Sequence, residues 1–169
     1  MSKYTVVVAD AKRARFFSLQ DSLTPEIESS PRLVEREVLA NPRNLQNEAK
    51  RLSSPNSGRN RVSSGASYAF DDHRGKRDLD GLRKFSTLIA KEALKQTRKE
   101  DAHSLVLVAG KRTLGMLRES LSAIKTNGLG IHECDRDLAG DTPAKIHELL
   151  AKMELVPPEK KPARKIVRK

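Results

Sequence analysis

The chain has 169 residues, a length that suits one domain with a hydrophobic core of its own. Its 37 % hydrophobic and 33 % charged residues indicate a modest core with polar additions, and the single cysteine excludes an internal disulfide. No segment is apolar enough for a targeting sequence or a membrane span, so we expect a cytoplasmic protein without membrane insertion.

The net charge of +11 is concentrated in two segments. Asn41–Arg77 holds eight basic and three acidic residues, and Pro157–Lys169 holds six basic residues and one acidic residue. The rest of the chain is nearly neutral. Excess positive charge on polar segments beside a neutral core is typical of proteins that bind polyanions.

The chain begins with a predicted β-hairpin over Tyr4–Leu19. Its first strand, Tyr4–Ala9, contains three consecutive valines, a run that favours a strand buried on both faces at the centre of a sheet. Its second strand, Ala14–Leu19, contains two adjacent phenylalanines. The polar turn between the strands starts with Asp10, whose carboxylate can accept hydrogen bonds from the turn backbone.

A third strand is predicted at Arg32–Leu39, at the edge of the sheet. The segment that follows, Asn41–Arg77, is rich in Ser, Asn, Arg and Gly. Structureless loops beyond about 12–15 residues are uncommon in compact domains and are usually functional or disordered. We therefore interpret this segment as a long basic loop and as the main candidate for function.

Helices and strands alternate after the loop. The pattern predicts a helix that starts at Asp78 or Asp80, a buried strand, a Leu-rich helix, a short strand, and a helix that opens at Thr142 with proline in its first turn. A hairpin followed by helix–strand alternation predicts an α/β fold with helices on the faces of a mixed sheet. The predicted domain covers residues 1–156, and residues 157–169 form a disordered polybasic tail.

The loop supplies the candidate RNA-binding residues. Arginine and lysine pair with phosphates, aromatic rings stack on bases, and a basic tail adds salt-dependent affinity. The candidates are Arg43, Lys50, Arg51, Arg59, Arg61, Tyr68, Phe70, Arg74, Lys76 and Arg77.

A possible anion site lies at Lys111, Arg112 and Thr113. These residues follow Gly110, where a buried strand meets the predicted start of a helix, and free amides at a helix N-terminus favour anions. The segment matches no phosphate-binding motif, so an ordinary strand–helix connection is the alternative.

No catalytic constellation is predicted. Asp10, Asp135 and Asp137 are conceivable ligands of a nuclease Mg²⁺ ion, although turns commonly use aspartate to bind their own backbone. The four histidines show no metal-ligand spacing with Cys134, and no nucleophile motif is present. We predict no metal, no cofactor and no catalytic residue.

Three segments together resemble the bacterial host attachment protein family: VVVADAKRARFFSL, LVLVAGKRTLGMLRESL and ECDRDLAGDTPAKIHELL. The resemblance covers residues 4–153. This family resembles in turn the middle domain of archaeal and eukaryotic peptide-chain release factors and of the ribosome-rescue protein Pelota.

The resemblance implies an RNase H-like three-layer sandwich with a mixed central sheet, and kinship with domains that act on the ribosome. In release factors the corresponding loop carries a Gly-Gly-Gln tripeptide for peptidyl-tRNA hydrolysis. Here the region reads SGRNRVSSGASYAF, without that tripeptide, so peptide release is not implied. Related domains that lack the glutamine function in binding, including ribosome rescue or hibernation.

We therefore expect a non-catalytic domain that binds structured RNA on the ribosome. Two alternatives remain open. One is a host-cell attachment or protein-interaction factor, as the family name suggests. The other is a metal-dependent nuclease that uses Asp10, Asp135 and Asp137.

Overall fold

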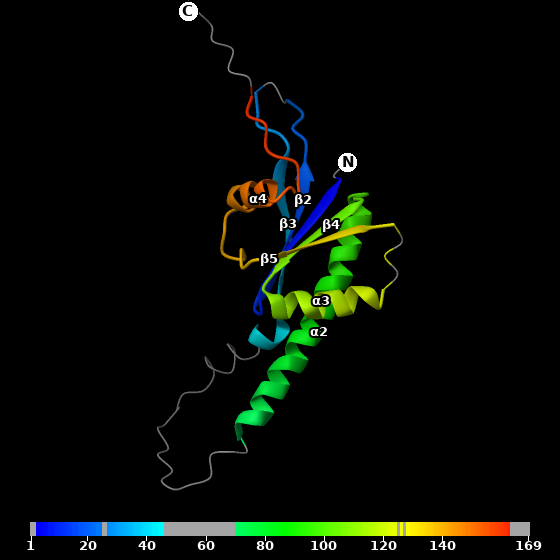
Figure 1. The fold of residues 1–169 in the computed structure, drawn as a ribbon, viewed down its shortest axis with the longest axis vertical. Coiled ribbons are helices and arrows are strands. Elements are labelled where there is room, and N and C mark those ends of the chain that lie inside the picture. Colours follow the sequence, from blue (N-terminus) through cyan, green and yellow to red (C-terminus); the bar gives the residue numbers. More distant parts are fainter. Residues whose placement is uncertain (1–2, 25–26, 46–69, 125, 127, 163–169) are drawn as a thin grey trace, which may run out of the picture.

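A five-stranded mixed sheet forms the centre of the computed structural model. The structure describes residues 3–24, 27–45, 70–124, 126 and 128–162, and for residues 70–76 it describes the backbone alone. The strands are β1 (Tyr4–Ala9), β2 (Arg13–Gln20), β3 (Arg32–Ala40), β4 (Ser104–Ala109) and β5 (Gly130–Asp135). Their order in the sheet is β3-β2-β1-β4-β5 (Figure 1). The predicted hairpin, the edge position of the third strand and the α/β class are confirmed.

Strand β1 lies at the centre of the sheet, as its valine run predicts. It pairs antiparallel with β2 and parallel with β4, and β5 continues the parallel part of the sheet. Val6 and Val8 face one side of the sheet, Val7 faces the other, and all three are fully buried. The two apolar faces require cover from both sides, which the helices supply.

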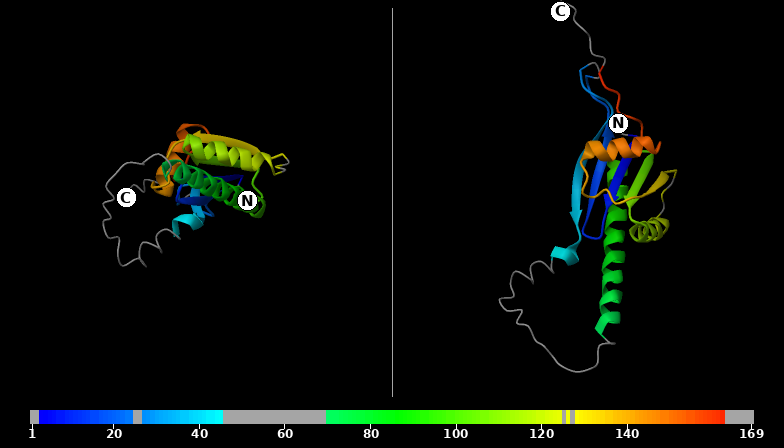
Figure 2. Two further views of the ribbon diagram at one scale, coloured as in Figure 1. Left: turned by 90° about the horizontal axis from the view of Figure 1, so that it is seen from below. Right: turned by 60° about the vertical axis from the view of Figure 1, so that its left-hand side comes forward.

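Helices α2 (Phe70–Lys99) and α3 (Lys111–Ser122) cover one face, and α4 (Pro143–Lys152) covers the opposite face (Figures 1 and 2). Phe85 and Ile89 of α2 pack with Leu117 of α3 in the first core, and Ile146 of α4 lies in the second. Thr142 caps α4, because its hydroxyl accepts a hydrogen bond from the Lys145 amide. This capping threonine and the proline that follows it match the prediction.

The start of α2 differs from the prediction. The helix begins at Phe70, so residues 70–77 have helical backbone and are not loop, and Asp78 and Asp80 lie inside the helix and do not cap it. The first turns carry Asp71 and Asp72, which suit the positive end of the helix dipole, but no apolar stripe. Hydrophobic periodicity therefore appears only further along, where the helix reaches the core.

The tail also differs from the prediction in part. Residues 157–162 are not disordered: Ser30 and Lys160 exchange two backbone hydrogen bonds, of 3.1 and 2.9 Å, and His147 Nε2 lies 2.8 Å from the Pro157 carbonyl oxygen. Backbone pairing of this kind does not depend on apolar side chains, so composition does not reveal it. Residues 163–169 and the loop residues 46–69 lie outside the described part of the chain.

Candidate nucleic-acid interface

Three segments meet at one end of the sheet: the turn of the β1–β2 hairpin, residues 41–45 and the start of α3. We call these three segments, together with the first half of α2, the basic end. Strands β1 and β4 are parallel, with Ala9 beside Ala109, so the hairpin turn and Gly110 leave the same edge. Asn41 joins the turn to the next segment: its amide donates to Lys12 O at 2.7 Å and its side chain to Ala11 O at 2.9 Å. This end therefore forms one continuous surface.

A groove of about 590 Å³ opens at this end between residues 41–43 and α2. Its cationic side chains are Arg43, Arg77 and Lys84, and Asp80 contributes a carboxylate. Phe85 and Leu88 supply an apolar floor. The groove therefore combines three positive charges and one negative charge with apolar surface, a combination that suits a nucleotide better than a free inorganic ion.

Arg43 lies directly on the backbone of α2. A Cβ atom built on Gly81 would come within 2.8 Å of Arg43 Cδ and Nη1, so any larger residue here would have to displace the Arg43 side chain from this position. Arg43 Nη2 lies 3.0 Å from Asp78 Oδ1, and the arginine side chain remains 33 % exposed. The guanidinium is therefore positioned by the helix while part of it faces solvent.

The structure describes the side chains of two predicted RNA-binding residues, Arg43 and Arg77, and both line the groove. For Phe70, Arg74 and Lys76 it describes only helical backbone in α2. The others lie outside the described residues: Lys50, Arg51, Arg59, Arg61 and Tyr68. Sequence reasoning missed Lys84, although it follows Arg77 by seven residues, a spacing that places both on one helical face.

The three residues of the predicted anion site point to different environments. Gly110 is the N-cap of α3 and makes no side-chain capping bond. Lys111 and Arg112 are exposed, and Lys111 Nζ lies 3.7 Å from Asp135 Oδ2. Thr113 is buried, with 8 % of its surface exposed. Lys111 and Arg112 add positive charge to the basic end, while Thr113 belongs to the protein interior.

The three candidate metal ligands have other partners. Asp10 Oδ1 accepts hydrogen bonds from the amides of Lys12 and Arg13, at 2.6 and 2.7 Å, which is the turn chemistry considered above. Asp135 pairs with Lys111, and Asp137 Oδ1 lies 3.4 Å from the Ala139 amide. Among the residues that the structure describes, no three His, Cys, Asp or Glu side chains are grouped to hold a metal ion.

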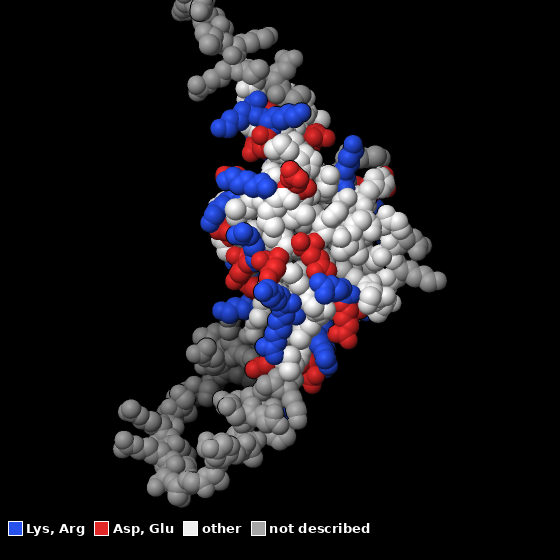
Figure 3. All heavy atoms as spheres, viewed as in Figure 1, with Lys and Arg blue, Asp and Glu red and all other residues white. Residues whose placement is uncertain are grey.

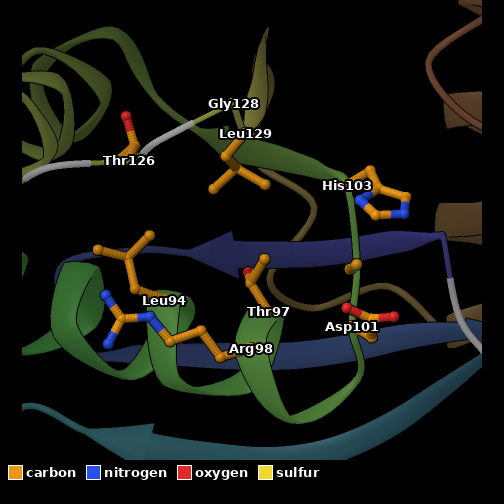
Figure 4. A pocket seen from close by; sticks show the side chains of 9 residues that line it. Leu94, Thr97, Arg98, Asp101, His103, Thr126, Gly128 and Leu129 are labelled. Carbon is orange, nitrogen blue, oxygen red and sulfur yellow. The ribbon is translucent and has the colours of Figure 1, made fainter.

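A second hollow, of about 280 Å³, lies at the opposite end of the sheet, beside the residues that precede β4 and β5. Figure 4 shows Leu94 and Arg98 on one side of it and Asp101 and His103 on the other, with Thr97 between them. These polar groups do not converge on a common point. The hollow therefore has no evident binding or catalytic chemistry.

Charge on the described surface is mixed. In the view of Figure 3, lysine and arginine side chains alternate with aspartate and glutamate, and the surface over the right-hand side is largely uncharged. This agrees with the sequence, in which the excess charge falls in Asn41–Arg77 and Pro157–Lys169. The groove adjoins the first of these segments.

The mixed sheet with helices on both faces defines an α/β domain, and one end of this domain is the basic end. The comparison of sequences then identifies the family: residues 5–150 match the model of the family described as "Protein required for attachment to host cells", and the chain belongs to that family. No curated protein matched the chain. Within the described residues, no helix combines the length and apolar character that a membrane span requires.

Proposed function

We propose that this protein is a non-catalytic RNA-binding domain that acts on the ribosome, and that its basic end is the binding surface. The observation that carries the proposal is the groove where Arg43, Arg77 and Lys84 come together from two separate segments. Within the described part of the chain, Arg77 and Lys84 form no ion pair, so their charges are available to phosphates.

The position of the groove supports an electrostatic role. It is lined by residues 41–43, which precede the segment 46–69 in the sequence, and by α2, which follows it. That segment carries four basic residues and one acidic residue. Lys12, Lys111 and Arg112 are exposed at the same end of the sheet. Positive charge from several separate segments on one surface attracts polyanions without sequence preference.

The ribosomal part of the proposal rests on resemblance. The three segments quoted above resemble the host attachment family, and that family resembles in turn the middle domain of release factors and Pelota. The mixed sheet between helical layers supports an RNase H-like sandwich. The absence of a Gly-Gly-Gln tripeptide from the sequence supports binding without peptide release. Because ribosomes are in the cytoplasm, we also propose that the protein is located there.

Attachment to host cells is the second candidate function, and the family description favours it. Such a role would require the protein outside the cell. Detection by antibody on intact cells, with a cytoplasmic enzyme as the control for lysis, would favour attachment over ribosome binding.

Sedimentation of cell lysate through a sucrose gradient tests the main proposal. We expect the protein to travel with ribosomal particles at low salt and to leave them at high salt, because phosphate contacts weaken as salt rises. Nuclease treatment of a parallel sample should release it. A protein that stays at the top of the gradient at low salt would contradict the proposal.

A further inference from the structure

We propose that the groove between residues 41–43 and α2 binds one nucleotide of an unpaired RNA strand, with its base against the guanidinium of Arg43 and its flanking phosphates at Arg77 and Lys84. The inference rests on the proposed RNA-binding function and adds the class of RNA, single-stranded, and the residues that bind it.

The base position follows from the geometry of Arg43. Gly81 allows the Arg43 side chain to lie close to the backbone of α2, and the ion pair with Asp78 holds the guanidinium there while 33 % of the side chain stays exposed. RNA-binding proteins commonly stack unpaired bases on aromatic rings or on guanidinium planes. The chain has few aromatic residues and no tryptophan, so a positioned arginine can serve this role here.

The phosphate positions follow from the helical spacing of Arg77 and Lys84. Seven residues separate them, which is two turns or about 10 Å along the axis of α2. Gly81 lies between them, so the Arg43 side chain crosses the helix between the two cations. A strand that runs along α2 would place a base at the centre and phosphates at both ends.

The apolar floor distinguishes an unpaired strand from a duplex. Leu88 is 42 % exposed and Pro42 is also exposed, while Phe85 beneath them is buried. A single nucleotide can cover this surface with its base. A duplex keeps its bases stacked inside and presents phosphates and groove edges, so it would leave the floor uncovered.

Substitution of Gly81 tests the groove without removing any charge. Gly81→Ala adds one methyl group that must displace Arg43, and Gly115→Ala is the matched control, because a Cβ at this helical glycine of α3 meets no atom within 4 Å. Both changes favour the helix, so both variants should fold. A second variant, Arg43→Lys, retains the charge but removes the planar group.

Fluorescence anisotropy with a labelled ten-nucleotide oligouridylate and an RNA duplex of the same length supplies the readout. We expect Gly81→Ala and Arg43→Lys each to weaken binding of the single strand at least fivefold and to change binding of the duplex less than twofold. Gly115→Ala should change the binding of either RNA less than twofold. Gly81→Ala that binds the single strand as tightly as Gly115→Ala would overturn the groove assignment. An equal loss for single strand and duplex would overturn the preference for unpaired RNA.

The sedimentation experiment separates this inference from the proposed function. If the unsubstituted protein travels with ribosomal particles while Gly81→Ala binds the oligonucleotide normally, the RNA-binding function stands and the groove assignment is wrong. If the unsubstituted protein binds neither RNA probe nor ribosomal particles, both are wrong.

Discussion

Arg15 and Glu35 form a two-bond ion pair between neighbouring strands of the sheet. Arg15 Nε donates to Glu35 Oε1 at 2.9 Å and Nη2 donates to Oε2 at 2.8 Å. Arg15 Nη1 also donates to the carbonyl oxygens of Ala139 and Asp141, at 3.1 and 2.6 Å. The guanidinium therefore joins β2 to β3 and to the loop that leads into α4.

Removal of Arg15 should destabilise the fold much more than removal of an exposed arginine with the same kind of partner. Arg15→Ala removes the donor of Glu35 and of the Asp141 carbonyl oxygen, while the Ala139 carbonyl oxygen keeps its hydrogen bond from Arg13 at 2.9 Å. The Arg15 side chain is only 11 % exposed. We expect a loss of about 2–3 kcal/mol in the free energy of unfolding, measured by urea denaturation.

Arg118 provides the matched control for Arg15. It makes a comparable two-bond pair with Glu133, but its side chain is 67 % exposed. Arg118→Ala should cost less than about 1 kcal/mol, because exposed pairs contribute little in water. Equal losses for the two variants would show that the position of Arg15 has no special importance.

The same ion pair should make stability depend on pH. The hydrogen bonds from Arg15 lower the pKa of Glu35 below its ordinary value of 4.5. As the pH falls, the unfolded chain takes up this proton before the folded chain does. The stabilisation by this ion pair is therefore complete above the ordinary pKa of 4.5, and it is lost as the pH falls through the lower pKa that Glu35 has in the folded protein.

Glu35→Gln isolates this contribution from that of other carboxylates. The variant should be less stable than the unsubstituted protein at pH 6, and the difference between them should shrink as the pH falls below 4.5 toward 3. Urea midpoints at half-unit pH intervals measure it. A difference that stays constant over this range would mean that Glu35 titrates with an ordinary pKa.

Cys134 should be unreactive in the folded protein. Its side chain is buried in the core beneath α4, and burial raises the pKa of the thiol. Because the thiolate is the reactive species, a thiol reagent such as Ellman's reagent should modify Cys134 only as the protein unfolds. Rapid modification in buffer, at the rate seen in urea, would show that α4 opens readily.

Local patterns in the sequence predicted the elements that pack into the core. The three valines of β1 identified the central strand, and the alternation of helical and strand patterns after the loop identified the elements from α2 to α4. Asp10 and Thr142 act as the turn and capping residues that their types suggest. These features depend on residues close together in the chain, so a single sequence contains them.

Features that join distant segments were not predictable in the same way. The contact of Arg43 with Gly81, the binding of Arg15 to Ala139 and Asp141, and the pairing of Ser30 with Lys160 each depend on the folded arrangement. The polar first turns of α2 lacked an apolar stripe, and this led to the wrong helix start. The groove at the basic end depends on the contact between residues 41–43 and α2, which local patterns in the sequence do not contain.

Removal of charge tests most directly whether RNA binds to the basic end and to residues 46–69, which join its two sides in the sequence. Arg59, Arg61, Arg74 and Arg77 are replaced together by alanine, and binding to purified ribosomal RNA is measured over a series of salt concentrations. The control removes the same number of charges elsewhere, at the exposed residues Lys91, Lys99, Lys145 and Lys152.

We expect the arginine variant to bind RNA more weakly than the unsubstituted protein at every salt concentration. The slope of log K against log salt should become shallower by roughly 0.7–0.9 for each phosphate contact that is lost. The lysine control should bind with nearly the slope of the unsubstituted protein. An arginine variant with unchanged affinity and unchanged slope would contradict this proposal, because these four arginines would then make no contact with RNA.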